Sequence, residues 1–271
     1  MENQRKSIMK IISYNVNGIR AAVKKGFFEW LDQERPDVIG IQETKAQPDQ
    51  IPEIIEGLQE LGYFTCWHSA VKKGYSGVAT FSKKKPSQII EGCDMPVYDL
   101  EGRILRTDFN DFILLNCYFP SGTTGDIRQE YKMEFLHDFN RWIKLVLKEN
   151  MPIVVLGDYN IAHTEMDIHD PVRNKKTSGF LPEEREWLQR LCDWGLEDSY
   201  RSMHAEDTRA YSWFDYRSRG FEQDPKIGLR IDLILASKGA MDDLHSTGID
   251  FDARAAEKPS DHCPIWANFT L

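Results

Sequence analysis

Apolar positions along the 271-residue chain follow two kinds of pattern. Short continuous apolar runs recur throughout, as expected of β-strands that are buried on both faces. Segments with apolar residues at helical spacing lie between them. The predicted strands are Lys10–Tyr14, Val38–Gln42, Gly77–Ser82, Ile104–Phe109, Phe112–Phe119, Pro152–Gly157, Ile231–Ala236 and Ile265–Phe269.

Three longer segments are predicted to be helices. The first is Phe27–Glu34. The second is Ile127–Glu149, and we assign its apolar stripe to the core rather than to a cofactor site. The third begins at Pro182, a residue favoured at the first helical position, and ends near Gly195. The stripe of the second helix consists of Phe135, Leu136, Phe139, Trp142, Ile143 and Val146.

Helices and strands alternate along the chain, and some strands form hairpin-like pairs. One such pair is Ile104–Phe109, which turns at Asn110 and Asp111 into the next apolar run. This mixture predicts an α/β fold in which sheets pack together and helices cover the outside. No linker-like segment interrupts the chain, so we expect one domain over residues 1–271, with residues 1–8 flexible.

The composition allows a large packed core, because 41% of the residues are hydrophobic. The longest apolar stretches have only the length of a strand, and Met1–Ser7 is polar. We therefore expect no membrane span, no secretory signal and a cytoplasmic location. The five cysteines are odd in number and lack a C-x-x-C pair, which argues against a disulfide framework or a zinc site.

The formal net charge of −9 is unusual for a protein that binds a polyanion. Net charge does not report how charge is distributed, however, and carboxylates that bind a metal increase the acidic count. Basic residues interleaved with glycine and aromatic residues fit contact with a phosphate backbone, although a charged run is usually only a solvated face. Three such segments are Lys72–Gly77, Arg173–Lys176 and Arg217–Phe221.

Five short polar segments carry the candidate chemistry, and four of them lie at or beside the end of an apolar run. Residues placed alike at strand ends can converge in space although they are distant in sequence. Carboxylates, amides and one histidine are the set needed to hold a hard cation and to hydrolyse a phosphate ester. The segments are Asn15–Gly18, Gln42–Lys45, Gly157–Asn160, Arg230–Asp232 and Lys258–His262.

Each candidate also has an ordinary structural interpretation. Glu43 directly follows a buried strand, so a metal or a basic side chain should meet it, but a simple salt bridge or a solvated loop acid would do so as well. Asp158 and Asn160 could hold a water between base and amide, or they could form an Asx-turn that closes the strand. Asn15 and Asn17 could be turn residues or neutral ligands.

His262 stands next to Asp261, and Asp232 lies at another strand end. A carboxylate on one ring nitrogen would orient the histidine and favour its imidazolium form, whereas a lone histidine is more often structural. Tyr118 follows an apolar strand, and its hydroxyl could reach a phosphate or could belong to a core residue with a solvated tip.

Together these motifs resemble the exonuclease III family of abasic-site endonucleases, within the wider endonuclease/exonuclease/phosphatase group. The resemblance covers nearly the whole chain. It implies a two-sheet α/β sandwich with helices on the outer faces, a Mg²⁺ cofactor for which Mn²⁺ can substitute, and cleavage on the 5′ side of an abasic sugar, often with 3′-end trimming. The motifs that carry it are Asn-x-Asn-Gly-Ile-Arg, Gln-Glu-Thr-Lys, Gly-Tyr-Ser-Gly-Val, Gly-Asp-x-Asn-x-Ala-His, Trp-Phe-Asp-Tyr-Arg-Ser and Lys-Pro-Ser-Asp-His.

The resemblance implies a role for each site residue. Glu43 corresponds to the main metal ligand, with Asn17 and Asp261 nearby. Asp158 corresponds to the residue that activates water, and Asn160 to the residue that positions that water. Both of these residues also belong to the expected metal site.

Further roles concern the phosphate. His262 would contact the scissile phosphate, with its ring oriented by Asp232. Tyr118 would add a second contact, Asn15 would hold the water-activating carboxylate, and Asn174 would stabilise the transition state or the leaving group.

The implied substrate is double-stranded DNA with abasic sites or damaged 3′ ends, and we expect a monomeric enzyme. The wall of a pocket for the flipped-out sugar would be formed by Trp213, Leu229 and Ile231. The residues expected to contact DNA are Arg20, Lys45, Lys72, Lys73, Gly74, Tyr75, Arg103, Lys175 and Lys176.

Some positions depart from the family pattern. Asn17 stands where some relatives have Asp, and Ser121 and Thr177 replace residues that are often amides, so the balance of endonuclease, exonuclease and 3′-phosphatase activities stays open. Two alternatives also stay open, namely a catalytically silent nucleic-acid-binding regulator on the same fold and another phosphodiesterase of the group. The regulator would be expected to lack the acids that are present here.

Overall fold

The computed structural model describes residues 7–255 and 260–271. The expected flexibility of residues 1–8 therefore falls mostly outside the described residues. The same is true of Lys258 and Pro259, the first two residues of the C-terminal motif.

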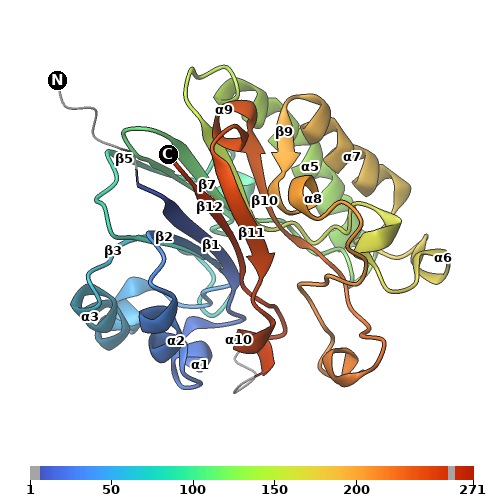
Figure 1. The fold of residues 1–271 in the computed structure, drawn as a ribbon, viewed down its shortest axis with the longest axis horizontal. Coiled ribbons are helices and arrows are strands. Elements are labelled where there is room, and N and C mark those ends of the chain that lie inside the picture. The colour runs from blue at the N-terminus through green and yellow to red at the C-terminus, as the bar shows by residue number, and fades with distance from the viewer. Residues whose placement is uncertain (1–6, 256–259) are drawn as a thin grey trace.

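Two six-stranded mixed sheets form the centre of the molecule (Figure 1). Their strand orders are β11-β12-β1-β2-β4-β3 and β5-β6-β7-β8-β10-β9. The strands of the first sheet are β1 (Met9–Asn15), β2 (Val38–Gln42), β3 (Phe64–His68), β4 (Val78–Ser82), β11 (Leu244–Ile249) and β12 (Ile265–Phe269). Those of the second are β5 (Gln88–Glu91), β6 (Ile104–Asp108), β7 (Ile113–Tyr118), β8 (Ile153–Asp158), β9 (Leu196–Asp198) and β10 (Asp232–Ser237).

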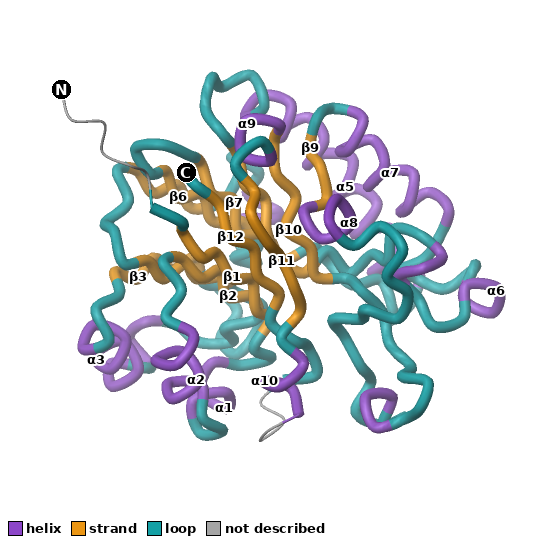
Figure 2. Tube along the Cα trace, in the orientation of Figure 1, coloured by secondary structure: helices purple, strands orange, loops and turns teal. Residues whose placement is uncertain are grey.

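Helices lie on the outer side of each sheet, as Figure 2 shows. One apolar cluster fills the space between the sheets, and two others join each sheet to its helices. The order helix, sheet, sheet, helix is the predicted α/β sandwich. The helices are α1 (Ile19–Val23), α2 (Phe27–Glu34), α3 (Pro52–Glu60), α4 (Pro96–Asp99), α5 (Asp126–Val146), α6 (Pro171–Asn174), α7 (Pro182–Asp193), α8 (Ser199–Met203), α9 (Lys238–Met241) and α10 (Phe251–Ala255).

Burial on both faces explains why the central strands have continuous apolar runs. Every residue of β2 and of β8 is buried, because one face meets the other sheet and the opposite face meets helices. The sheets approach closely at Gly40, where a Cβ atom would lie only 2.3 Å from the side chain of Leu156. Within residues 7–255 and 260–271, no helix is both long enough and apolar enough to cross a membrane.

The edge strands were not predicted. These strands are β3, β5 and β11, together with the three-residue β9. Most residues of β5 are exposed and those of β11 are mostly half-buried, so neither has the continuous apolar run that marks a buried strand. The short helices α1, α4, α6, α8, α9 and α10 were missed too, since four or five residues are too few to display a period.

The strand directions bring the polar segments to one end of the sandwich. Strands β1 and β2 are parallel, as are β7 and β8, so Asn15, Gln42, Tyr118 and Asp158 all end their strands at this side. Strand β10 runs antiparallel to β8 and begins with Asp232 paired to Asp158. The site is therefore a consequence of the topology.

Candidate active site

The carboxylate of Asp158 is buried at the end of β8 and surrounded by amides. Its Oδ2 accepts hydrogen bonds from Asn15 Nδ2 at 2.9 Å and from Asn160 Nδ2 at 3.2 Å. Its Oδ1 accepts the backbone N–H of Asn160 at 2.9 Å, which is an Asx-turn. The two interpretations of this motif are thus compatible, because one oxygen closes the turn while the other faces the site.

His262 lies directly across from Asp158. Its Nε2 is 3.8 Å from Asp158 Oδ2, and its Nδ1 is 2.8 Å from Asp232 Oδ2. The hydroxyl of Ser212 donates to the same Asp232 oxygen at 2.6 Å and fixes that carboxylate in turn. The predicted orienting role of Asp232 fits this geometry, whereas Ser212 was not identified from the sequence.

Burial and charge shift the pKa values of this pair. Burial alone would disfavour the imidazolium of His262, but the carboxylates of Asp232 and Asp158 outweigh it and raise its pKa to about 10. Burial raises the pKa of Asp158 to about 7, with His262 acting in the opposite direction and Asp232 and Glu43 in the same one. Near neutral pH, His262 is therefore protonated and Asp158 can accept a proton.

Glu43 forms a second charged centre beside this pair. Its Oε1 accepts hydrogen bonds from Asn15 Nδ2 at 3.0 Å and from the Tyr118 hydroxyl at 2.8 Å. Its Oε2 lies 2.6 Å from Lys45 Nζ. Burial alone would raise the pKa of Glu43, but the ammonium of Lys45 outweighs this effect and lowers it.

The oxygens around Lys45 form a site that suits a cation. The amide oxygen of Asn17 accepts from Lys45 Nζ at 2.5 Å, so the oxygens of Asn17 and Glu43 converge on one positive group. Asn17 Nδ2 in turn donates to Asp261 Oδ1 at 2.9 Å. Carboxylate and amide oxygens are the ligands that hard divalent cations prefer. Ligand atoms of Glu43, Asp158 and His262 also lie within 4.8 Å of one another, and the two carboxylates of this cluster could bind a metal ion.

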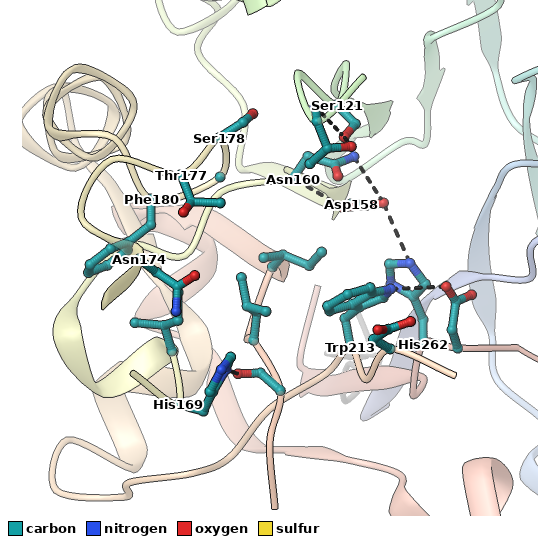
Figure 3. A pocket seen from close by; sticks show the side chains of 18 of the residues that line it. Ser121, Asp158, Asn160, His169, Asn174, Thr177, Ser178, Phe180, Trp213 and His262 are labelled. Atoms are coloured by element: carbon teal, nitrogen blue, oxygen red, sulfur yellow. Dashed lines mark hydrogen bonds and ion pairs between the residues drawn. The ribbon is translucent and has the colours of Figure 1, made fainter. Parts of the chain in front are cut away.

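A cavity of about 500 Å³ opens beside the charged residues (Figure 3). Its wall includes Trp213, Leu229 and Ile231, the three residues predicted for it, and also Ile168 and Phe180, which were not predicted. The indole N–H of Trp213 donates to Asp261 Oδ2 at 3.0 Å and connects the wall to the acidic site. Figure 3 shows Asn174 and Thr177 across the cavity from Trp213 and His262.

The endonuclease/exonuclease/phosphatase family model matches residues 12–262. The chain therefore belongs to this family. It is 39% identical over 273 residues to exodeoxyribonuclease III of Haemophilus influenzae, with 96% of this chain and 100% of the relative covered.

Two solved structures have the same fold. The 3′ phosphatase NExo from Neisseria, bound to a product DNA hairpin, matches with a TM-score of 0.89 and 32% identity over 96% of this chain and 99% of its own. An AP endonuclease from Archaeoglobus fulgidus matches with a TM-score of 0.89 and 29% identity over 97% and 100%. The resemblance to exonuclease III and the fold class are thus confirmed. The protein is a hydrolytic nuclease.

Most residues predicted to contact DNA lie on the surface of this nuclease. Arg20 is exposed next to the acidic site, and its guanidinium donates to the carbonyl of Lys45 at 3.2 Å. The exposed residues Lys72, Lys73 and Gly74 precede the half-buried Tyr75. Lys175 and Lys176 are exposed after α6. Lys45 differs from these residues, because it is half-buried and its ammonium is held by Glu43 and Asn17.

Arg103 differs from the other residues predicted to contact the DNA backbone. Its side chain is buried, with 2% of its surface exposed. Its guanidinium donates to Glu101 at 2.6 Å, to the carbonyl of Tyr118 at 3.0 Å and to the hydroxyl of Tyr75 at 3.1 Å. It also lies over the Tyr118 ring, 4.9 Å from the ring centre. Arg103 therefore holds Tyr118 and Tyr75 in place, and its contact with DNA stays a prediction.

Proposed function

We propose that this protein is a DNA repair nuclease that uses Mg²⁺ to hydrolyse the phosphodiester on the 5′ side of an abasic site in double-stranded DNA. The observation that carries the proposal is the cavity, with an apolar wall, that adjoins the buried pair of Asp158 and His262. A sugar without its base can enter such a cavity after it is flipped out of the duplex. The names of the relatives, exodeoxyribonuclease III and AP endonuclease, support the same substrate.

The first step assigned to these residues is the activation of water. A water held by Asp158 and the amide of Asn160 would give its proton to the carboxylate and attack the phosphorus in line. Asn15 keeps the carboxylate in place through its 2.9 Å hydrogen bond. A pKa of about 7 suits Asp158 to this role, because a general base works best when its pKa lies near the working pH.

The second step is the stabilisation of charge as the 3′ oxygen leaves. The protonated His262 would direct Nε2–H at a phosphate oxygen, with Asp232 holding the opposite nitrogen. Tyr118 and Asn174 both line the cavity and could donate to the phosphate or to the leaving oxygen. Glu43, Asn17 and Asp261 would hold Mg²⁺, or Mn²⁺ in its place, with Asp158 and Asn160 at its edge. When bound, the ion would supply positive charge for the reacting phosphate.

The cavity would select the substrate. Trp213, Leu229 and Ile231 present apolar surface to the sugar. Damaged 3′ ends would place their phosphate at the same charged residues while using less of the cavity. The exposed residues Arg20, Lys72, Lys73, Gly74, Lys175 and Lys176, with Tyr75, would contact the DNA backbone. The cytoplasmic location and the monomeric state stay predictions.

A gel assay with three labelled duplexes tests the proposal. One carries an abasic site, one a recessed 3′ end and one a 3′-phosphate, and each is incubated with and without Mg²⁺. We expect incision of the abasic duplex only with Mg²⁺, and we expect Asp158→Asn to lose several orders of magnitude in turnover while it still binds the duplex. Binding without Mg²⁺-dependent hydrolysis of any of the three would favour the regulator instead.

A further inference from the structure

A completely buried ion pair lies next to the segment that carries Asn160. Lys132 on α5 and Glu184 on α7 are both 0% exposed, and Lys132 Nζ is 2.7 Å from Glu184 Oε1. In the sequence both residues look like ordinary helical surface charges. Neither residue lines the cavity, so any effect of the pair on the reaction must pass through the groups that it contacts.

Lys132 contacts the backbone of a site residue. Its ammonium donates to the carbonyl oxygen of Asn160 at 2.9 Å. Asn160 has a φ of 51°, in the left-handed region, which asparagine adopts more readily than most other residues with a Cβ atom. Its side chain is thereby directed to Asp158, to which it donates at 3.2 Å. The buried ammonium thus stabilises the unusual backbone conformation from which the amide reaches the carboxylate.

Glu184 contacts the backbone of the cavity wall. Its Oε2 accepts from the N–H of Gly179 at 2.7 Å and from the N–H of Leu181 at 3.0 Å. Phe180, between them, lines the cavity. The two backbone segments also meet directly, because the N–H of Ala162 donates to the carbonyl of Gly179 at 2.8 Å.

Stability alone does not require an ion pair at this place. Removing two charges from water is costly, and apolar residues of similar volume often replace a buried pair without loss of stability. What apolar residues cannot do is donate to the Asn160 carbonyl on one side and accept from two backbone N–H groups on the other. These directed hydrogen bonds point to a geometric role.

We infer that Lys132 and Glu184 are positioning residues that hold Asn160 and Phe180 in a fixed mutual geometry, so that the water-activating carboxylate and the sugar cavity stay aligned. This inference rests on the proposed function. Because Asn160 serves the reaction on every substrate, loss of the Lys132 hydrogen bond should slow both abasic incision and 3′-phosphate removal.

Two variants isolate that hydrogen bond. Glu184→Gln keeps an oxygen acceptor for Gly179 and Leu181 and leaves Lys132 able to donate to Asn160. It should lower the Tm, because the new amide nitrogen would face the donors of Lys132 and Gln129 in place of Oε1. Lys132→Met in the same Glu184→Gln background removes only the donor. We expect Glu184→Gln to keep kcat within threefold of wild type. We expect the double variant to lose at least tenfold in kcat on both duplexes, with KM changed less than threefold.

A matched control guards against a general loss of packing. Arg106 pairs with Asp108 at 2.7 Å on β6 and with the exposed Glu149 at 2.6 Å, and both Arg106 and Asp108 are buried. Arg106→Met combined with Asp108→Asn removes a buried pair that touches no site residue, and it should keep kcat near wild type whatever happens to its Tm. Rates are measured well below the Tm of the least stable variant. If the Met variant does not fold, Lys132→Leu in the Glu184→Gln background repeats the test.

The outcomes separate the two hypotheses. If the wild-type enzyme hydrolyses none of the duplexes, the proposed function fails and the inference fails with it. If wild type is active but the double variant stays within twofold of Glu184→Gln, the pair is only structural. A loss no larger than that of the Arg106/Asp108 control at a similar Tm would likewise overturn the inference.

Discussion

Trp213 makes two contacts that can be separated by substitution. Its ring forms part of the cavity wall, while its indole N–H donates to Asp261 Oδ2 at 3.0 Å. Trp213→Phe keeps an aromatic wall and removes the N–H, whereas Trp213→Ala removes both. The first change should disturb the acidic site, and the second should in addition weaken the capture of a flipped sugar.

The two losses have different sizes. A hydrogen bond to a charged acceptor contributes about 1.5–3 kcal/mol. Because Asp261 is only half-buried, we take the lower end, which corresponds to roughly a tenfold loss of rate for Trp213→Phe. Lost apolar contact with the sugar in Trp213→Ala adds about 1.5–3 kcal/mol, or a further factor of roughly 10 to 150, on the abasic substrate.

Single-turnover rates at fixed ionic strength on abasic and 3′-phosphate duplexes measure both effects. We expect Trp213→Phe to slow the two reactions equally, since the acidic site serves both. Trp213→Ala should slow abasic incision more than 3′-phosphate removal. Equal losses on the two substrates in Trp213→Ala would mean that this side chain does not select the sugar, and an unchanged Trp213→Phe would mean that its hydrogen bond to Asp261 is not needed.

Three further predictions follow from the charged groups. Glu43→Gln should raise the Mg²⁺ concentration needed for half-maximal incision, with partial rescue at high Mg²⁺, because an amide provides less charge to the ion. An unchanged Mg²⁺ titration would show that Glu43 is not a metal ligand. Arg103→Lys should lower the incision rate, because it weakens the contacts that hold Tyr118, but it should leave the salt dependence of DNA binding unchanged. Lys72→Ala should instead reduce the slope of log binding constant against log salt concentration by about one. A reduced slope in Arg103→Lys would mean that Arg103 does contact the DNA backbone. Burial alone would raise the pKa of Asp167, but Arg230 and Arg201 outweigh it and hold the pKa well below its usual range. The carboxylate therefore stabilises the fold at pH values above its unfolded pKa of about 3.9 and loses this effect as pH falls further. Urea unfolding should show Asp167→Asn less stable by about 3–5 kcal/mol at pH 7, with a gap that narrows below pH of about 4; a gap independent of pH would contradict the assignment.

The sequence by itself determined the centre of the fold and pointed to the polar segments that the fold brings together at one end of the sandwich. Strands such as β2 and β8 are buried on both faces, so their apolar runs are unbroken and visible in one dimension. The polar residues that follow them break those runs abruptly. Asn15, Glu43 and Asp158 could therefore be found without a structure, because their position at a strand end is a local property.

Tertiary structure alone decided features that depend on what a residue meets across the fold. The edge strands β5 and β11 bury too little surface to show a pattern, and their pairing depends on neighbours distant in sequence. The sequence alone does not show whether a basic side chain points to solvent or into the protein. Tertiary packing buries Arg103 against Tyr118 and brings Lys132 to Glu184. A charged side chain can be buried only when segments distant in sequence supply its partners.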